Sequence, residues 1–308
     1  MPSARDLAVP RLDAAELVVP APGAGPGNWA GAPTATLVDG AVYLTYRVRR
    51  PLTAGRGVSV VVARSEDGVA FEHVAEVRQQ DFGAESFERP VVVRRPDGGW
   101  RLYLSCATAS SKHWWIEAVD ADRPEDLPVG RRTRTLPGSA TEAVKDPVVL
   151  VDESGWRMWV CCHPLTDLGH EDRMSTKYAT STDGLTWQVH GVVLSPTPGS
   201  WDARGTRVTT VLQERPLVVL YDGRATAEQN WHEVTGLATE RDGRLEAGPD
   251  NPVATSPSSD GALRYASAVH LPQGGTRFYF EAAREDGAHD LYTSVSLGDR
   301  REALVPGH

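Results

Sequence analysis

Charged side chains recur beside short apolar segments along this chain of 308 residues. Glu88 stands just before the apolar segment that begins at Pro90, and Lys145 and Asp146 stand just before the one that begins at Pro147. Cleavage of a glycosidic bond needs two carboxyl groups across that bond, one as the acid and the other as nucleophile or base. Arginine binds carboxylate or phosphate groups in a bidentate manner. The residue types therefore indicate chemistry on a sugar, on an anion, or on both.

The candidate site residues stand just before or just after predicted strands. We expect three carboxyl groups to be catalytic, with Asp146 as the acid, Glu88 as the second carboxylate and Glu281 as its substitute. The residues expected to bind the substrate are Trp29, Arg47, Arg89, Lys145, His163, Arg204, Asp222, Arg224, Arg264 and Tyr265. Each has a structural alternative, because carboxylates cap turns and arginines neutralise carboxylates in buried networks. If two or three arginines remain unpaired, they imply an anionic ligand.

An internal repeat would position these groups. Pro33, Pro90 and Pro147 are spaced 57 residues apart, and each belongs to a short motif that leads into an apolar strand. Further copies of the pattern begin at Arg204 and Arg264. Each copy continues with a tight turn, often Asp-Gly or Gly-Gly, and an aromatic-rich strand, as expected for hairpins. Four antiparallel strands repeated five times at this period predict a propeller.

The predicted fold is all-β, a single five-bladed β-propeller domain of four-stranded antiparallel blades over residues 1–308. The predicted blades span approximately 28–80, 86–136, 143–197, 201–252 and 262–300. A two-domain sandwich is the competing interpretation, and the regular spacing of the prolines argues against it. In a propeller, residues before the first strand and after the second strand of each blade converge on one central funnel, where we expect the site.

The composition excludes several classes of protein. The formal net charge of −9 argues against nucleic acid as a partner, because phosphate backbones need a basic surface. We find no apolar run long enough to span a membrane and no signal peptide, so a membrane partner is not expected and a cytoplasmic location is. Three cysteines do not make a disulfide framework. The oligomeric state is not predicted.

No metal or cofactor is expected from the motifs. His163, His170 and Glu171 are close in sequence, but without a helix to align them their spacing does not indicate a metal site. The chain has neither a glycine-rich phosphate-binding loop nor a Gly-x-Ser-x-Gly nucleophile motif. The expected partner is a small molecule, either a sugar or an anionic metabolite.

Several motifs resemble those of one superfamily. They are Trp29-Ala30-Gly31-Ala32-Pro33, Lys145-Asp146-Pro147, the Ser-x-Asp-Gly-x-x-aromatic turns that end at Phe71 and Trp187, and Tyr221-Asp222-Gly223. Together with the repeat, from about Asn28 to Val295, the chain resembles the five-bladed propeller glycosidases. These comprise the furanosidases and xylosidases, the invertase-like fructosidases and the mannoside phosphorylases.

The resemblance implies a carboxylate before the first strand of each of the first three blades. The first acts as nucleophile or base, the second tunes and orients, and the third is the acid. The matching positions here are Ala32, which has no carboxyl group, Arg89, with Glu88 one residue earlier, and Asp146. The chain therefore departs from the superfamily's triad. Either the carboxyls have moved to Glu88, Asp146 and Glu281, or the chemistry differs.

Three functions remain open. The first is a glycoside-processing enzyme, a hydrolase or a phosphorylase, acting on a small neutral or anionic glycoside in the funnel. The second is a repurposed propeller that binds or transforms an acidic metabolite without hydrolysis, because fold does not fix function. The third is a protein-binding scaffold, which would not need so many charged residues around the funnel.

Overall fold

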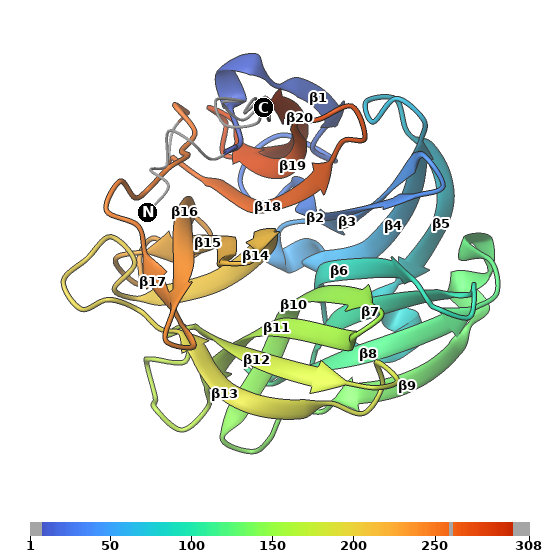
Figure 1. Ribbon diagram of the computed structural model, residues 1–308. Coiled ribbons are helices and arrows are strands. Elements are labelled where there is room, and N and C mark those ends of the chain that lie inside the picture. Colours follow the sequence, from blue (N-terminus) through green and yellow to red (C-terminus); the bar gives the residue numbers. More distant parts are fainter. Residues whose placement is uncertain (1–7, 259–260, 298–308) are drawn as a thin grey trace, which may run out of the picture.

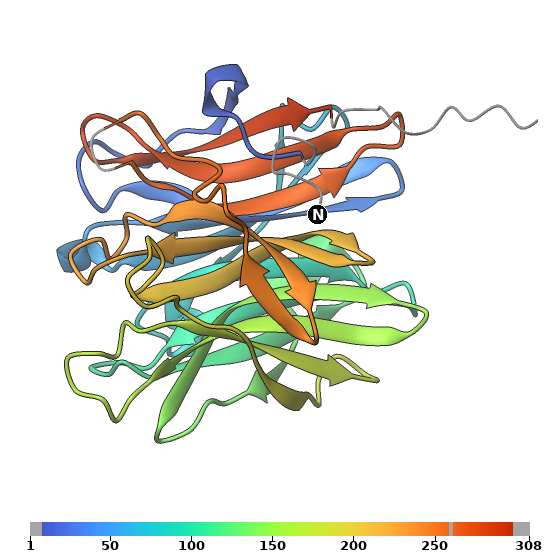
Figure 2. The same cartoon turned by 60° about the vertical axis from the view of Figure 1, so that its left-hand side comes forward.

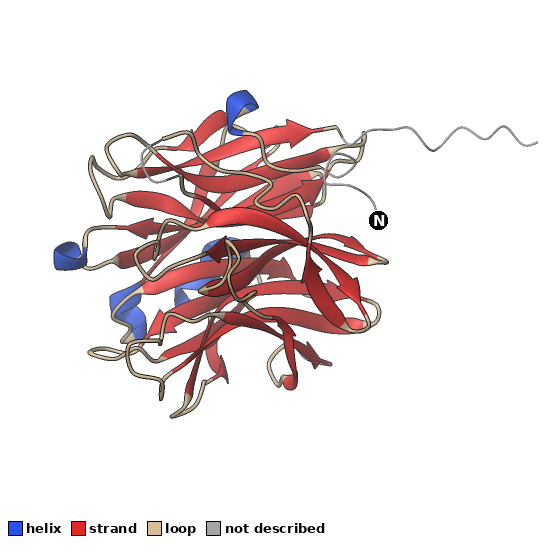
Figure 3. Ribbon diagram, turned by 90° about the vertical axis from the view of Figure 1, so that its left-hand side faces the viewer, coloured by secondary structure: helices blue, strands red, loops and turns tan. Residues whose placement is uncertain are grey.

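Strands make up almost all of the chain. The computed structural model describes residues 8–258 and 261–297, and its helices are short 3₁₀ turns. Figure 3 shows this all-β architecture, with the few helical turns at its periphery. These turns are η1 (Leu12–Ala14), η2 (Leu52–Ala54), η3 (Gln79–Phe82) and η4 (Pro124–Val129). The predicted all-β class is confirmed.

Three antiparallel sheets have four strands each, in sequence order. The first comprises β6 (Phe87–Arg94), β7 (Trp100–Ala107), β8 (Trp114–Ala121) and β9 (Arg131–Leu136). The second comprises β10 (Glu142–Asp152), β11 (Gly155–Pro164), β12 (Ser175–Ser181) and β13 (Gln188–Leu194). The third comprises β14 (Gly205–Glu214), β15 (Leu217–Arg224), β16 (Val234–Arg241) and β17 (Arg244–Ala247).

The remaining sheet has eight strands and contains two antiparallel units. One unit comprises β2 (Trp29–Val38), β3 (Ala41–Arg49), β4 (Gly57–Ser65) and β5 (Glu72–Arg78). The other comprises β18 (Leu263–His270), β19 (Thr276–Ala283), β20 (His289–Ser296) and, paired with β20, β1 (Glu16–Val19). A single parallel pair, Trp29 with His289, joins the two units.

The second of these units combines both ends of the described chain, which lie side by side in Figures 1 and 2. Its outer strand β1 lies outside the predicted segment 262–300, whose last three residues lie outside the described residues.

The first strands of the units form a closed ring. Contacts run from β2 to β6, then to β10, β14 and β18, and back to β2, and the sheets accordingly surround a central axis in Figure 1. Apolar side chains fill the space between successive units. For example, Phe87 and Leu104 pack with Val60, and Met158 and Val160 pack with Val91. This packing brings the starts of all the first strands to one end of the axis.

A bulge near the start of several first strands turns side chains toward the axis. The pairing register shifts between Gly31 and Thr34 in β2, and at the equivalent places in β6, β10 and β18. Ala32, Asp146 and Tyr265 occupy these bulges with φ of 50°, 53° and 56°. Bulges re-aim side chains, and non-glycine residues at positive φ are strained and cluster at functional sites. The residues in the bulge of β6 are Glu88 and Arg89.

The Ser-x-Asp-Gly turns lock neighbouring units together. Gly68 and Gly184 adopt positive φ of 77° and 68° at the ends of these turns. The buried hydroxyl of Tyr103 donates a hydrogen bond to the Gly184 carbonyl at 2.7 Å. The hydroxyl of Tyr279 donates one to the Gly68 carbonyl at 2.8 Å. In both cases the tyrosine belongs to one unit and the turn to the next one along the ring.

Replacing Tyr103 by Phe tests this contact between units. The buried Gly184 carbonyl loses its hydroxyl partner, so we expect the free energy of unfolding to fall by about 1–2 kcal/mol, measured by urea denaturation. The matched control is Tyr46→Phe, because the half-buried Tyr46 hydroxyl makes no hydrogen bond to a described residue. That control should change stability by less than about 0.5 kcal/mol. Equal losses in the two variants would contradict the proposed contact.

Candidate functional site

A cavity of about 310 Å³ opens at the end of the axis where the first strands begin. It is lined by charged side chains from all of the units and by two tryptophans, Trp114 and Trp231. Its cationic residues are Arg47, Arg56, Lys112, Lys145, Arg204, Arg207, Arg224 and Arg264. Its acidic residues are Glu88, Glu171, Asp172 and Glu233. Cationic groups thus outnumber acidic ones in the wall of a cavity that belongs to an acidic protein.

Most of the predicted site residues line this cavity. They are Glu88, Arg47, Lys145, His163, Arg204, Arg224, Arg264 and Tyr265. Five others do not: Asp146, Asp222, Glu281, Arg89 and Trp29. Of the three predicted catalytic carboxyls, only Glu88 is therefore in the cavity wall.

The phenol of Tyr265 is the centre of the buried network beneath the cavity. Arg207 Nη1 donates to the Tyr265 oxygen at 2.8 Å and to Asp146 Oδ2 at 2.9 Å. The Tyr265 hydroxyl lies 3.3 Å from Glu88 Oε2 and 3.4 Å from Asp146 Oδ2. Arg207 also holds Asp222, through Nη2 to Oδ2 at 2.6 Å. One hydroxyl and one guanidinium thereby connect β6, β10, β14, β15 and β18.

Asp146 and Asp222 are both fully buried in this network. Although burial opposes ionisation, Lys145 and Arg207 lower the pKa of Asp146. A general acid needs the opposite shift. Burial raises the pKa of Asp222 to about 6 against the pull of Arg207. Asp146, the predicted acid, is thus an ionised partner of Arg207 and lies behind the cavity wall.

Glu281 fills the place of the missing carboxylate on β2. Its Oε2 accepts the Ala32 backbone N–H at 3.0 Å, and a Cβ on Gly31 would lie 1.8 Å from the same oxygen. The other oxygen accepts from Arg264, at 2.9 and 2.8 Å, and lies 2.7 Å from His289 Nδ1. Burial opposes ionisation, but Arg264 above all holds the pKa of Glu281 well below its usual range. A negative charge is thus present beside Ala32, but it is buried and paired.

Three acidic groups both line the cavity and join the network: the buried Glu88 and Glu233, and the partly exposed Asp172, which pairs with Arg204 and Arg224. Glu88 pairs with Arg47 and its side chain is 7% exposed. Glu233 accepts from Arg224 and Arg264, each at 2.6 Å. Burial opposes its ionisation, but Arg264, Arg207 and Arg224 lower the pKa of Glu233. Glu233 was not among the predicted site residues, because it follows a loop and no motif marks it.

One side of the cavity has cations without strong acidic partners. The Arg56 guanidinium lies 5.7 Å from the Trp114 ring centroid, and Lys145 Nζ lies 5.2 Å from it. Arg56 makes no ion pair within the described residues, its Nε is buried without a hydrogen-bond partner there, and its φ is 57°. Lys145 is 3.7 Å from Asp146 Oδ2. Burial lowers the pKa of both cations. Neither Arg56 nor Trp114 was among the predicted site residues.

His163 faces the same side of the cavity. Burial, and secondarily the charge of Lys145, lowers the pKa of His163 to about 3, so its imidazole is neutral. Its Nδ1 is buried and has no hydrogen-bond partner among the described residues. A neutral imidazole with an open nitrogen can bind a sugar hydroxyl or a phosphate oxygen.

Besides Asp222, two predicted binding residues lie outside the wall of this cavity. Trp29 is buried, with its ring 4.6 Å from that of His289 and 3.9 Å from the Arg49 guanidinium, so it supports the wall from behind. Arg89 points along the axis in the other direction and lines a second cavity. The bulge in β6 separates Glu88 from Arg89, and so sends the two side chains to opposite ends of the ring.

Within residues 8–258 and 261–297, no three His, Cys, Asp or Glu side chains are grouped so as to hold a metal ion. All three cysteines are buried free thiols. Among the same residues, no helix has the length and apolar character needed to cross a membrane.

Solved structures that share this fold include several glycoside hydrolases. A thermostable family-43 glycoside hydrolase has a TM-score of 0.66 and 13% identity, over 86% of this chain and 88% of that one. The family GH43_1 enzyme from Xanthomonas citri, solved with xylotriose, has a TM-score of 0.62 and 16% identity, over 95% and 96%.

A structure from a study of the GH130 family, described as mannoside phosphorylases that include hydrolases of β-1,2 mannosidic linkages, has a TM-score of 0.58. Its identity is 15%, over 98% of this chain and 99% of that one. No protein-family model and no curated protein sequence matches the chain. The predicted resemblance to the propeller glycosidases is confirmed, and at these identities it is a likeness of fold.

Replacing Glu281 by Gln tests the buried network. The variant leaves Arg264 and Arg47 with one anionic partner fewer, so we expect the free energy of unfolding at pH 7 to fall by about 3 kcal/mol or more. The folded-state pKa of Glu281 is depressed, so its stabilisation is present above the unfolded pKa of about 4.3 and is lost as the pH falls below it.

The loss of stability between pH 5 and 3 should therefore be shallower in Glu281→Gln than in the parent protein, as measured by thermal unfolding across this range. Glu66→Gln serves as the control, because the Glu66 side chain is 81% exposed and pairs only with Arg64 at the surface. An unchanged pH profile for Glu281→Gln would show that this carboxylate does not stabilise the fold through its charge.

Proposed function

We propose that this protein is a glycoside-processing enzyme whose funnel cavity binds an anionic group, supplied either by an acidic sugar or by phosphate. The proposal includes a five-bladed propeller, in which the three four-stranded sheets and the two units of the eight-stranded sheet are the blades, with β1 as the outer strand of the last. The fold likeness to glycoside hydrolases and to the mannoside phosphorylase family supports the general activity.

The main support for an anionic ligand is the surplus of cationic groups over acidic ones in the cavity wall. Buried cations need counter-charges. Arg56 makes no ion pair with a described residue, and Lys145 shares its partner Asp146, 3.7 Å away, with Arg207. An anionic group of the ligand would supply a counter-charge. The flat ring of Trp114 would then face the sugar, while the neutral His163 would accept or donate a hydrogen bond to its hydroxyls.

The chemistry follows from which carboxyls face the cavity. Glu88 is the one predicted catalytic carboxyl in its wall, whereas Asp146 and Glu281 are fully buried and paired. Phosphorolysis needs a single carboxyl for proton transfer, because phosphate itself attacks the anomeric carbon as the glycosidic C–O bond breaks. Only one of the three predicted catalytic carboxyls lines the cavity, in a wall where cations outnumber acidic groups. This supports phosphorolysis, or cleavage of an acidic glycoside, over hydrolysis by the carboxyl pair that the sequence predicted.

A second candidate is ligand binding without cleavage. It is supported by the burial of Asp146, Asp222 and Glu281, each of which is paired with arginine. On this alternative the cavity binds an acidic metabolite, and the carboxyls only balance the arginines. Activity assays separate the two.

Activity should be measured on a panel of neutral and uronic aryl glycosides, with and without phosphate. We expect turnover of a uronide, or phosphate-dependent turnover of a neutral glycoside, and a fall in kcat/KM of at least about 100-fold in Glu88→Gln. The variant should keep the thermal stabilisation by the anionic ligand. No turnover of any substrate, with anion-dependent stabilisation intact, would reject the enzyme and favour the binding protein.

Anion binding itself is tested with glucuronate and glucose, a pair that differs in the carboxylate. We expect glucuronate, and not glucose, to raise the melting temperature, and Arg56→Met to weaken glucuronate binding about tenfold through loss of one charge-assisted contact. The control is Arg241→Met, since Arg241 is 47% exposed and pairs with Glu246 on an outer strand. Equal responses to both sugars would contradict the anion site.

A further inference from the structure

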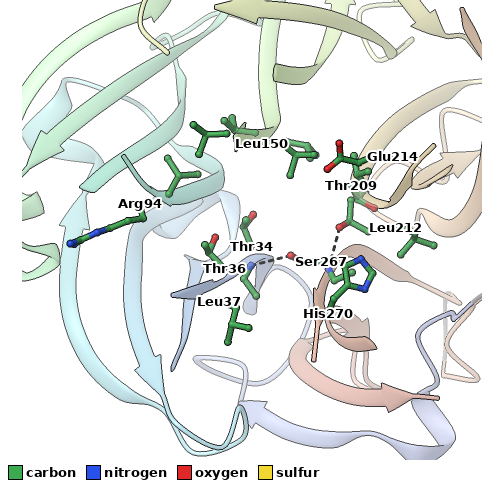
Figure 4. Close-up of a pocket in the computed structure, with 18 of the residues that line it drawn as sticks. Thr34, Thr36, Leu37, Arg94, Leu150, Thr209, Leu212, Glu214, Ser267 and His270 are labelled. Carbon is green, nitrogen blue, oxygen red and sulfur yellow. Dashed lines mark hydrogen bonds between the residues drawn. The ribbon is translucent and has the colours of Figure 1, made fainter. Parts of the chain in front are cut away.

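A second cavity, of about 450 Å³, opens at the other end of the ring (Figure 4). It is lined by the later residues of the same five first strands, β2, β6, β10, β14 and β18. Its wall combines apolar side chains with hydroxyl groups such as those of Thr34 and Ser267. Its charged residues are Arg89, near the start of β6, together with Arg94 and Glu214. Neither the fold nor the funnel chemistry requires a cation there.

Arg89 is 1% exposed and forms no ion pair with a described residue, although the charges of Asp146 and Asp222 act on it. Its Nε donates to Thr34 Oγ1 at 3.1 Å and its Nη2 to the Pro33 carbonyl at 3.2 Å. Its Nη1 is buried without a hydrogen-bond partner, and no ion pair joins the guanidinium to any carboxylate in the described part of the chain. A buried charge without a partner is strongly unfavourable.

The nearest carboxylates already serve other cations. Asp146 pairs with Arg207 and Lys145. From Arg89 it accepts a hydrogen bond of the backbone N–H, and none of the guanidinium. Asp222 pairs with Arg207. Burial lowers the pKa of Arg89 to about 10, although Asp146 and Asp222 oppose that shift. Within the described residues, Arg89 is therefore the cation beneath the funnel that lines the second cavity and lacks an ion pair.

Three hydroxyl groups that line the same cavity can donate hydrogen bonds to a ligand. Thr34 Oγ1 accepts from Arg89, Ser267 Oγ accepts from the Ala35 backbone N–H at 3.0 Å, and Thr210 Oγ1 accepts from the Ala268 N–H at 3.2 Å. Each oxygen is thus already an acceptor, and no described group accepts its own hydrogen. Free hydroxyl hydrogens around a guanidinium provide donors, which an anion needs and a cation cannot use.

We propose that this second cavity binds a small monovalent anion, such as a halide, against Arg89 and the hydroxyl groups of Thr34, Thr210 and Ser267. The anion would supply the counter-charge that the chain lacks there. The site is separate from the funnel, and it stands whether or not the proposed glycoside chemistry is correct.

Bromide is the probe, because its anomalous scattering locates it directly. We expect crystals of the protein soaked in sodium bromide to show an anomalous peak in this cavity, within about 4 Å of the Arg89 guanidinium. In solution, bromide or chloride should raise the melting temperature more than gluconate does at equal ionic strength. Crystals that show no bromide in this cavity would overturn the proposal.

Two variants assign the binding to Arg89. Arg89→Met should lower bromide affinity at least about tenfold, through loss of the charged donor. Arg94→Met should not, because Arg94, although it also lines the cavity, is exposed to solvent and its guanidinium lies 5.2 Å from the Trp100 ring centroid. If Arg89→Met does not fold, Ser267→Ala should weaken bromide binding several-fold by removing one donor. A halide response that is unchanged in every variant would contradict the site.

Discussion

The guanidinium of Arg207 holds the centre of the molecule together. It binds Asp146 from the unit before it, Asp222 from its own unit and the Tyr265 hydroxyl from the unit after it. Because the first strands converge on one axis, their opening residues are forced into a small volume. Charges placed there must be balanced among themselves, and most of the site's geometry follows from that balance.

The charges are not balanced equally throughout the network, and the groups that remain exposed to the cavities determine the chemistry of the site. Asp146, Asp222 and Glu281 are fully buried, and each forms an ion pair with an arginine. Removing one partner from such a network is strongly destabilising, whereas the intact network adds little net stability. Its contribution is to fix the orientation of the remaining cations. These line the funnel on one side and leave Arg89 facing the second cavity on the other.

The sequence predicted the strands and the convergence well, because both depend on local signals. The proline spacing and the Asp-Gly turns mark where strands begin and end, and the turns reappear as contacts such as Tyr103 to Gly184. The pairing of β1 with β20 was not predicted, since it joins segments at opposite ends of the chain and only tertiary packing specifies it.

The individual site residues were harder to predict, for two physical reasons. A one-residue difference at a bulge sends Glu88 and Arg89 to opposite ends of the axis, and pairing register cannot be derived from residue type. Glu233 and Arg56 reach the cavity from segments that border loops, which carry no repeat signal. The lost carboxylate at Ala32 was seen from the sequence, but its spatial replacement by Glu281 depends on contacts between units.

The most direct test is a crystal structure of the protein with a bound aryl glucuronide or with its cleavage product. We expect the ligand's carboxylate to lie beside Trp114, within hydrogen-bonding distance of Arg56 and Lys145, with the anomeric carbon toward Glu88. A ligand bound with its carboxylate turned to solvent, or density confined to a site outside the funnel cavity, would contradict this expectation.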